Sequence, residues 1–287
     1  MLMVNLLECG VANMEKFKIN FKLKELDEVL LWGEEPHQQI HWFGLTDGLL
    51  WIDVGERTIY EYSEEAQRYY GEYHPYNDYQ LTRFLEDFSD LFRYIGESIP
   101  SDLYDAINDF SFRDKIDRWV DMYADLSDEE FAHFMETDYM GVKWFGDRIM
   151  DSGHLIGGPH IGFFRCGDKL KIIWDGTYKL ENGCSMWKSP YGAVEITYKL
   201  FVDEVTRFFH AFYTAMDRQV ENAVNRDWGN VSLDKVRLVK ENAERKEGFD
   251  QMIAFLSRTS SSTDWNHVKR MYTKMLGEIG GQRETVE

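Results

Sequence analysis

Residues 17–24 have the sequence FKINFKLK, in which apolar and polar side chains alternate strictly. The phenylalanines, isoleucine and leucine would lie on one face of an extended chain, and the lysines and asparagine on the other. A period of two is typical of a β-strand with one buried and one solvated face. We therefore predict that a half-buried strand begins the folded part of the chain.

Three aromatic-rich runs follow this strand, separated by residues that favour turns. We predict a strand at Gln39–Leu45, then a turn at Thr46-Asp47-Gly48 before the run 49–53. A second turn at Val54-Gly55-Glu56 leads into the run 57–62. Short runs joined by tight turns predict an antiparallel meander.

From residue 81 the period of the apolar residues changes to that of a helix. Apolar side chains follow the i, i+3, i+4, i+7 spacing of one helical face as far as residue 95. Further helices are expected over 101–124, with a break near Ser111, and over 127–140. Ser127 and Glu130 have the spacing of a capping box at the start of the last of these helices.

A second β-rich region is expected over 155–198, where Gly, Pro, Asn and Asp interrupt short apolar runs. We predict hairpin strands at Ile161–Cys166, Lys169–Trp174 and Cys184–Lys188. A long amphipathic helix, one or two helices over 232–258 and a last helix beyond the Ser- and Thr-rich loop complete the chain.

These elements predict an α+β fold with two antiparallel β-meander regions, an acidic helical segment between them and a C-terminal set of helices. We expect a single domain over residues 14–256, preceded by an N-terminal extension, 1–13, and followed by a loop and a helix, 257–287. The domain divides into a β region 14–63, acidic helices 77–150, a β region 155–198 and helices 199–256.

Composition excludes several classes of protein. The chain has 287 residues, a net charge of −19 and 15% aromatic residues. Disordered chains are poor in aromatics, and nucleic-acid binding requires clustered Lys and Arg, so neither class fits. No apolar run reaches the roughly 18 residues of a membrane helix, and the run 1–12 lacks the basic start of a signal peptide. Cys9, Cys166 and Cys184 form no CxxC pair, which predicts reduced thiols in a cytoplasmic protein.

The negative charge is concentrated in one region. Residues 77–140 hold 17 acidic and 5 basic side chains, so −12 of the net −19 lies there. Aspartates recur at helical spacing between apolar positions and would line a wet helical face: Asp102, Asp105, Asp109, Asp114, Asp117, Asp121 and Asp125. Such a stripe fits a solvated helical face, a docking surface for a basic protein, or a divalent-cation site. The spacing and central glycine of an EF-hand are absent, and we expect no bound metal.

The best concentration of potential catalytic side chains lies in the second β region. His154, His160, Asp168 and Asp175 could supply a base and an orienting carboxylate. The two histidines lack the spacing of a helical zinc site. A hairpin preceded by a Gly-Gly-Pro bend explains the same residues without chemistry.

A second constellation places aromatic rings beside carboxylates in the first β region: His41, Trp42, Asp47, Trp51 and Asp53. Rings that stack on sugars and acids that hydrogen-bond to them occur together in carbohydrate sites, and two carboxylates can form a glycosidase pair. The alternative is structural, because Asp-Gly is the expected content of a tight turn. The sequence lacks the glycine-rich phosphate loops and the G-x-S-x-G elbow, so we expect no cofactor.

The order of features in the chain resembles that of a bacterial family classed only as a domain of unknown function. The resemblance rests on the strand at 17–23, on the run H-W-F-G-L-T-D-G at 41–48 and on the later run from Asp147 to the long helix ending near Trp228. It covers about residues 14–256 and implies a bacterial cytosolic protein. It implies no reaction and no catalytic residues.

Our leading hypothesis is a non-enzymatic, acidic binding protein that neutralises or regulates a basic protein partner, in the manner of an immunity protein or antitoxin. The acidic helices and the lack of catalytic motifs favour it. The alternatives are an uncharacterised hydrolase with a His/Asp site within residues 154–175, and a structural subunit of a bacterial complex. We expect no nucleic-acid or membrane partner, and the sequence leaves the oligomeric state open.

Overall fold

The computed structural model describes residues 16–71, 74–258 and 262–281. Its elements form two antiparallel sheets, a small parallel pair and several helices, which confirms the predicted α+β class. The predicted extension at residues 1–13 lies outside the described residues. The strands are β1 Phe17–Leu23, β2 Gln39–Ile40, β3 Asp47–Val54, β4 Arg57–Ile59, β5 Asn77–Gln80, β6 Ile149–Met150, β7 His160–Cys166, β8 Lys169–Asp175, β9 Tyr191–Thr197 and β10 Ser232–Leu233.

The first sheet consists of β1, β3, β4 and β5, with β3 in the centre. The predicted strand at the start of the chain is confirmed as β1, whose Phe17 and Ile19 are buried. It pairs antiparallel with β3 along its whole length, while β4 and β5 pair with the other side of β3. The predicted turn at Val54-Gly55-Glu56 is confirmed, and Gly55 adopts a φ of 58° there.

Two predictions in this region are wrong. Only Gln39–Ile40 of the predicted strand Gln39–Leu45 is extended, because the chain then turns into the 3₁₀-helix η1, Gly44–Thr46, which places Trp42 and Leu45 in the core. The predicted turn at Thr46-Asp47-Gly48 is instead the start of β3, where Gly48 lies opposite Leu23.

The second sheet has the order β6-β7-β8-β9, and all its neighbours are antiparallel. The predicted hairpin is confirmed as β7 and β8, whose register pairs His160 with Asp175. The predicted strand Cys184–Lys188 is wrong, because that segment makes only isolated bridges, one of them between Trp187 and Tyr62. The third long strand of this sheet is β9.

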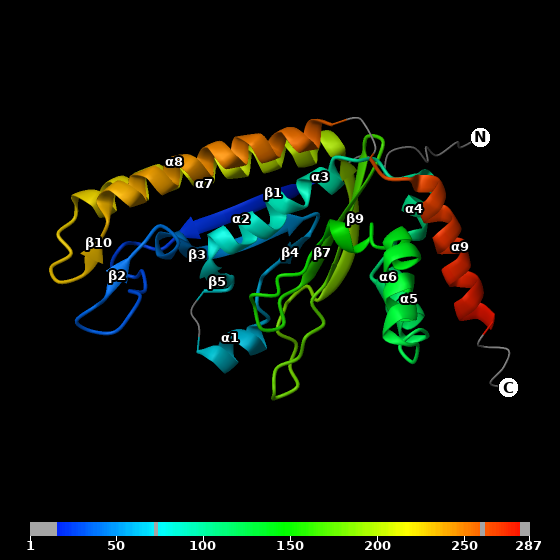
Figure 1. Cartoon of the computed structure of the whole chain (residues 1–287). Helices are drawn as coiled ribbons and strands as arrows, with labels where there is room; N and C mark the ends of the chain where they lie inside the picture. The colour runs from blue at the N-terminus through cyan, green and yellow to red at the C-terminus, as the bar shows by residue number, and fades with distance from the viewer. Residues whose placement is uncertain (1–15, 72–73, 259–261, 282–287) are drawn as a thin grey trace, which may run out of the picture.

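The helices divide into two groups around the second sheet (Figure 1). Their bounds are α1 Glu64–Tyr70, α2 Leu81–Asp90, α3 Phe92–Ile95, α4 Ser101–Ala106, α5 Ser111–Asp121, α6 Asp128–Thr137, α7 Tyr198–Asn225, α8 Lys235–Ile253 and α9 Trp265–Gly281, with short 3₁₀ turns η2 Tyr139–Gly141, η3 Gly146–Arg148 and η4 Ala254–Ser257. Helices α7 and α8 lie side by side, and α7 runs along β1 of the first sheet (Figure 1). Helix α2 contacts β3 and α8, and α3 contacts α8 and β7 of the second sheet.

The two faces of the second sheet belong to two different hydrophobic cores. Phe163 and Ile172 face the main core, which the first sheet and α2, α3, α7 and α8 complete. Phe164 and Ile173 face a second core formed with α4, α5, α6 and α9. The predicted long helix is confirmed as α7, which begins where the Thr197 side chain accepts a hydrogen bond from the N–H of Leu200.

A buried ion pair lies beside the second core. Arg148, which is 1% exposed, donates from Nη2 to Glu97 Oε2 at 3.0 Å. The other oxygen of Glu97 accepts from the N–H groups of Ser262 and Thr263, at 2.9 Å each. The pair therefore fixes the segment that leads into α9. None of the helices in the described ranges combines the length and the apolar character that crossing a bilayer requires.

Candidate functional site

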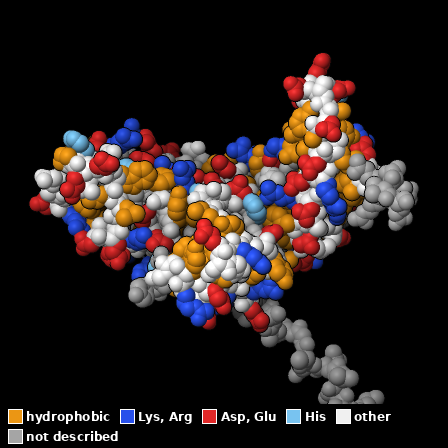
Figure 2. Space-filling view, turned by 90° about the horizontal axis from the view of Figure 1, so that it is seen from below, with side chains coloured by type: hydrophobic (Ala, Val, Ile, Leu, Met, Phe, Trp, Pro, Cys, Tyr) orange, Lys and Arg blue, Asp and Glu red, His pale blue; other side chains and the backbone are white. Residues whose placement is uncertain are grey.

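The seven aspartates predicted to share a wet face all lie in or between α4 and α6, residues 101–137, which we call the acidic lobe. Helix α5 buries Phe112, Ile116 and Trp119 against the second core. Its aspartates occupy the opposite, solvated side, as the helical period predicts. Acidic side chains are prominent over the projecting end of the molecule in Figure 2, on the side where Figure 1 shows α5 and α6.

Three of the seven carboxylates have partners within the chain. Asp102 pairs with Lys269 of α9 at 2.8 Å, and Asp117 lies 3.8 Å from Arg113. Asp109 accepts from the N–H of Ser111 at 2.8 Å and so begins α5. The hydrogen bond from Lys269 lowers the pKa of Asp102, and the hydrogen bonds from Ser111 lower that of Asp109. These three residues have structural roles in addition to their charge.

The other four carboxylates are exposed to solvent. Asp105, Asp114, Asp121 and Asp125 form no ion pair with any residue that the structure describes. Like charges at helical neighbour spacing cost only a few tenths of a kcal/mol each, so folding tolerates them. Their field extends into solvent over roughly a Debye length, about 8–10 Å at physiological salt.

The acidic lobe is held firmly to the rest of the protein. Glu278 of α9 accepts from the indole N–H of Trp119 at 2.6 Å and from the hydroxyl of Tyr123 at 2.7 Å. Lys171 of β8 donates to the carbonyls of Tyr104 and Ile107 at the end of α4. The predicted capping box at Ser127 is confirmed at the start of α6. The exposed carboxylates therefore stand on a rigid support.

The structure does not bring the four candidate catalytic residues together. His154 Nδ1 lies 3.3 Å from Asp87 Oδ2, on α2. His160 and Asp175 are cross-strand neighbours at one end of the β7–β8 hairpin. Asp168 lies in the turn at the other end, about 20 Å away for six residues at 3.3 Å each. Any chemistry at His160 would therefore proceed without His154 and Asp168.

His160 does gain a neighbour that no sequence pattern indicated. Asp151 directly follows β6, whose pairing with β7 places it opposite His160. Burial lowers the pKa of His160 and Arg113 lowers it further, whereas Asp151 and Asp175 raise it. The ring Nδ1 is buried and has no hydrogen-bond partner among the described residues. A neutral imidazole with an unsatisfied nitrogen contributes no catalytic geometry by itself.

The five candidate ligand residues divide between the core and the surface. Trp42 is buried and donates from its indole N–H to Asn242 at 2.9 Å, and Asp47 is also buried. Trp51 stacks on Tyr76 with centroids 4.1 Å apart. Trp51 and Asp53 share the outer face of β3.

His41 contacts the ring of Trp32, and burial lowers its pKa. The carboxylate of Asp53 accepts a hydrogen bond of 3.0 Å from the Thr58 hydroxyl and lies 3.4 Å from Lys16 Nζ. The buried side chains of Trp42 and Asp47 offer no surface to a ligand that contacts Trp51 and Asp53 on the outer face of β3. The five residues therefore do not form a single carbohydrate site.

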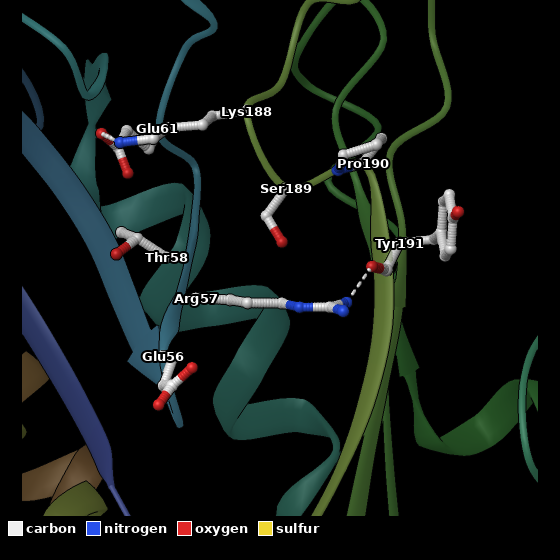
Figure 3. A pocket seen from close by; sticks show the side chains of 8 residues that line it. All are labelled: Glu56, Arg57, Thr58, Glu61, Lys188, Ser189, Pro190 and Tyr191. Atoms are coloured by element: carbon white, nitrogen blue, oxygen red, sulfur yellow. Dashed lines mark hydrogen bonds and ion pairs between the residues drawn. The ribbon is translucent and has the colours of Figure 1, made fainter.

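A cavity of about 440 Å³ lies elsewhere, where the two sheets meet (Figure 3). One wall is the β3–β4 hairpin, and the other is the segment that leads into β9. Arg57 reaches across and donates from Nη1 to the carbonyl of Tyr191 at 2.7 Å. Lys188 pairs with Glu61 at 2.6 Å. No sequence pattern indicates this cavity, because its walls are 134 residues apart and neither contains a motif.

Within the described ranges, no three His, Cys, Asp or Glu side chains are arranged to hold a metal ion. Among models of known protein families, one described as a family of unknown function, DUF5984, matches residues 18–271. No curated protein and no solved structure matches the chain significantly.

Proposed function

Because this chain belongs to the family of unknown function DUF5984, whose name assigns no activity, we propose a function from its surface. The protein is a non-enzymatic binding protein whose acidic lobe docks a basic protein partner. The observation that carries the proposal is a set of exposed aspartates on α4, α5 and the loop after α5 that form no ion pair among the described residues: Asp105, Asp114, Asp121 and Asp125.

Electrostatics favours a docking role for such a surface. A field of one sign accelerates encounter with a cationic partner and suppresses encounters with acidic ones. Because exposed pairs contribute at most about 1 kcal/mol each, affinity must come from several pairs acting together. The rigid support beneath the lobe helps, since fixed charges lose little conformational entropy when a partner binds.

The separation of the candidate catalytic residues supports a binding role over hydrolysis. His154 pairs with Asp87, and Asp168 lies at the far end of the hairpin from His160. Cys166 and Cys184 are both free, which suits the cytosolic setting that we propose for the complex.

The test compares two variants with the same change in charge. The lobe variant carries Asp105→Asn, Asp114→Asn, Asp121→Asn and Asp125→Asn. The control variant neutralises four exposed carboxylates elsewhere that also form no ion pair among the described residues: Glu34→Gln, Glu35→Gln, Glu181→Gln and Glu247→Gln. Each immobilised protein is used to capture partners from a lysate of cells that naturally express it, and the partners are eluted with rising salt.

We expect a basic protein that binds wild type and the control variant, elutes as salt rises and is lost from the lobe variant. Circular dichroism and thermal melting must show that both variants fold. A partner retained equally by the lobe variant, or one insensitive to salt, would contradict the proposal.

A further inference from the structure

Strand β9 is the outermost strand of the second sheet, so one of its edges has no neighbouring strand among the described residues. The N–H of Tyr198 donates to the carbonyl of Asp168, and the N–H of Gly176 donates to the carbonyl of Pro190. At both ends of β9, residues with even numbers therefore direct their backbone groups toward β8. Because hydrogen-bonded and non-hydrogen-bonded pairs alternate along an antiparallel ladder, the residues with odd numbers direct their N–H and C=O groups outward. At the middle of the strand these residues are Ala193 and Glu195.

Within the described part of the chain, the outward backbone groups of Ala193 and Glu195 have no partner. Both residues are exposed, and no described residue hydrogen-bonds to their outward N–H or C=O groups. The edge of β1 differs, because there α7 supplies Glu204 and Arg207 to the N–H and C=O of Ile19. Edge strands left open are templates for pairing with another chain, and proteins usually block them. The described part of the chain blocks the edge of β1 and leaves that of β9 open.

The open edge ends at the cavity of Figure 3. Arg57 uses Nη1 to bind the carbonyl of Tyr191, which occupies the outward acceptor at the start of β9. A guanidinium has five N–H donors, and within the described residues Arg57 forms no ion pair. Figure 3 shows the Ser189 hydroxyl directed toward the Arg57 side chain. Glu61 is neutralised by Lys188, and Glu56 is exposed, so water screens its charge.

We propose that the edge of β9 and this cavity bind an extended peptide that ends in a free C-terminal carboxylate. The peptide adds as a strand antiparallel to β9, because Arg57 lies at the Tyr191 end, where β9 begins. Its backbone pairs with the N–H and C=O groups of Ala193 and Glu195, and its carboxylate meets the guanidinium of Arg57. Strand addition supplies affinity through the main chain, and capture of the carboxylate fixes the register.

The dimensions agree with this occupant. An added strand lies about 4.8 Å from its neighbour, and two residues on an edge offer four hydrogen-bonding groups. A cavity of about 440 Å³ falls within the roughly 300–1,000 Å³ of small-ligand sites, which is room for a terminal residue. This site adjoins the acidic lobe at Glu195, whose carboxylate accepts a hydrogen bond from the Tyr104 hydroxyl at 2.8 Å. None of the exposed aspartates of the lobe lines the cavity, so the two proposals can fail independently.

The first test uses the wild-type chain and synthetic probes. A library of seven-residue peptides with randomised side chains and a free C-terminus is screened against the immobilised protein, beside the same library with C-terminal amides. The best free-acid sequence is then remade as the amide and with N-methyl groups on alternate backbone nitrogens. We expect amidation of the C-terminus to weaken binding at least tenfold in fluorescence polarisation. N-methylation of the alternate nitrogens that face β9 should weaken it at least tenfold as well. A screen without binders, or equal affinity of all forms, overturns the proposal.

The second test uses variants of the protein. Ala193→Pro removes an outward N–H and leaves the hydrogen bonds to β8 in place. Proline is tolerated at such positions on edge strands. The substitution should weaken all forms of the peptide at least tenfold. Arg57→Gln should abolish the difference between acid and amide. Arg68→Gln, an exposed arginine on α1, and the lobe variant should both bind the peptide as wild type does. If Ala193→Pro fails to fold, the N-methylated probes make the same test on wild type.

Discussion

The backbone N–H of Ile19 in β1 donates a hydrogen bond of 2.7 Å to Glu204 Oε1 in α7. Both residues are buried, at 2% and 8% exposure. Arg207 completes the arrangement, because its Nη2 donates to the carbonyl of Ile19 at 2.6 Å and also contacts Glu204. A helix side chain therefore occupies the place of a neighbouring strand, and the edge of the first sheet is satisfied without further pairing.

Substitution of Glu204 with alanine should destabilise the fold. It leaves the N–H of Ile19 buried without an acceptor, which costs about 1–3 kcal/mol. Urea unfolding followed by tryptophan fluorescence measures the change. Glu221→Ala on the exposed side of the same helix is the matched control and should change stability by less than about 0.5 kcal/mol. Equal effects of the two substitutions would show that the bond to Ile19 contributes nothing.

Substitution within the buried pair Arg148–Glu97 should lower the free energy of unfolding more than Glu204→Ala does. Arg148→Met leaves Glu97 without its buried counterion, and breaking one partner of such a pair costs about 3–5 kcal/mol. We also expect faster hydrogen exchange at the amides of Ser262 and Thr263, which Glu97 holds. The exposed Arg118→Met serves as the control. A loss below about 1 kcal/mol in urea unfolding would mean that the pair is dispensable.

Local periodicity is sufficient to predict much of the fold. The alternation in residues 17–24 predicts β1, and the spacing of apolar residues predicts α7, because each pattern matches the face that the element buries. The hairpin of β7 and β8 follows from apolar runs beside Gly167-Asp168. Strand β9 escapes prediction, since its sequence YGAVEIT has a glycine and a weak pattern at an exposed edge.

The site is predictable only where it is local in sequence. Helical spacing alone places the aspartates of the acidic lobe on a solvated face, because neighbours on one helix are fixed by their separation along the chain. The contact between Arg57 and Tyr191 depends on how two sheets meet, and no pattern within either segment reports that. The same holds for Asp151, which reaches His160 only through the pairing of β6 with β7.

Stability should decrease as pH falls below about 6.5, partly because of His160. Burial is the main cause that lowers the pKa of this histidine in the folded chain. At a pH between the two pKa values of His160, the unfolded chain binds more protons than the folded chain. The contribution of His160 to stability is therefore fully present above its unfolded pKa, and it is lost as pH falls from that value toward the lower pKa of the folded chain. His160→Gln should flatten the dependence of urea stability on pH between about 7 and 5. The control His133→Gln, at an exposed histidine, should retain the wild-type dependence on pH. If His160→Gln also retained it, His160 would not be its source.

Gly48 should not tolerate a side chain, although its Asp-Gly sequence suggests an ordinary turn. It lies in β3 opposite Leu23, and a Cβ there would clash with the carbonyl oxygen of Lys22 in β1. Because that atom belongs to the backbone of a paired strand, the strands must separate. Gly48→Ala should therefore cost about 1–3 kcal/mol in urea unfolding.

Gly248 provides the matched control for this substitution. It lies within α8 with open space around its Cβ position, so Gly248→Ala should stabilise the chain by about 0.5–1 kcal/mol through helix propensity. Opposite signs at the two positions would show that β3 approaches β1 too closely for any residue but glycine. A neutral Gly48→Ala would mean that the two strands separate at this point without cost, contrary to the register that joins them along their whole length.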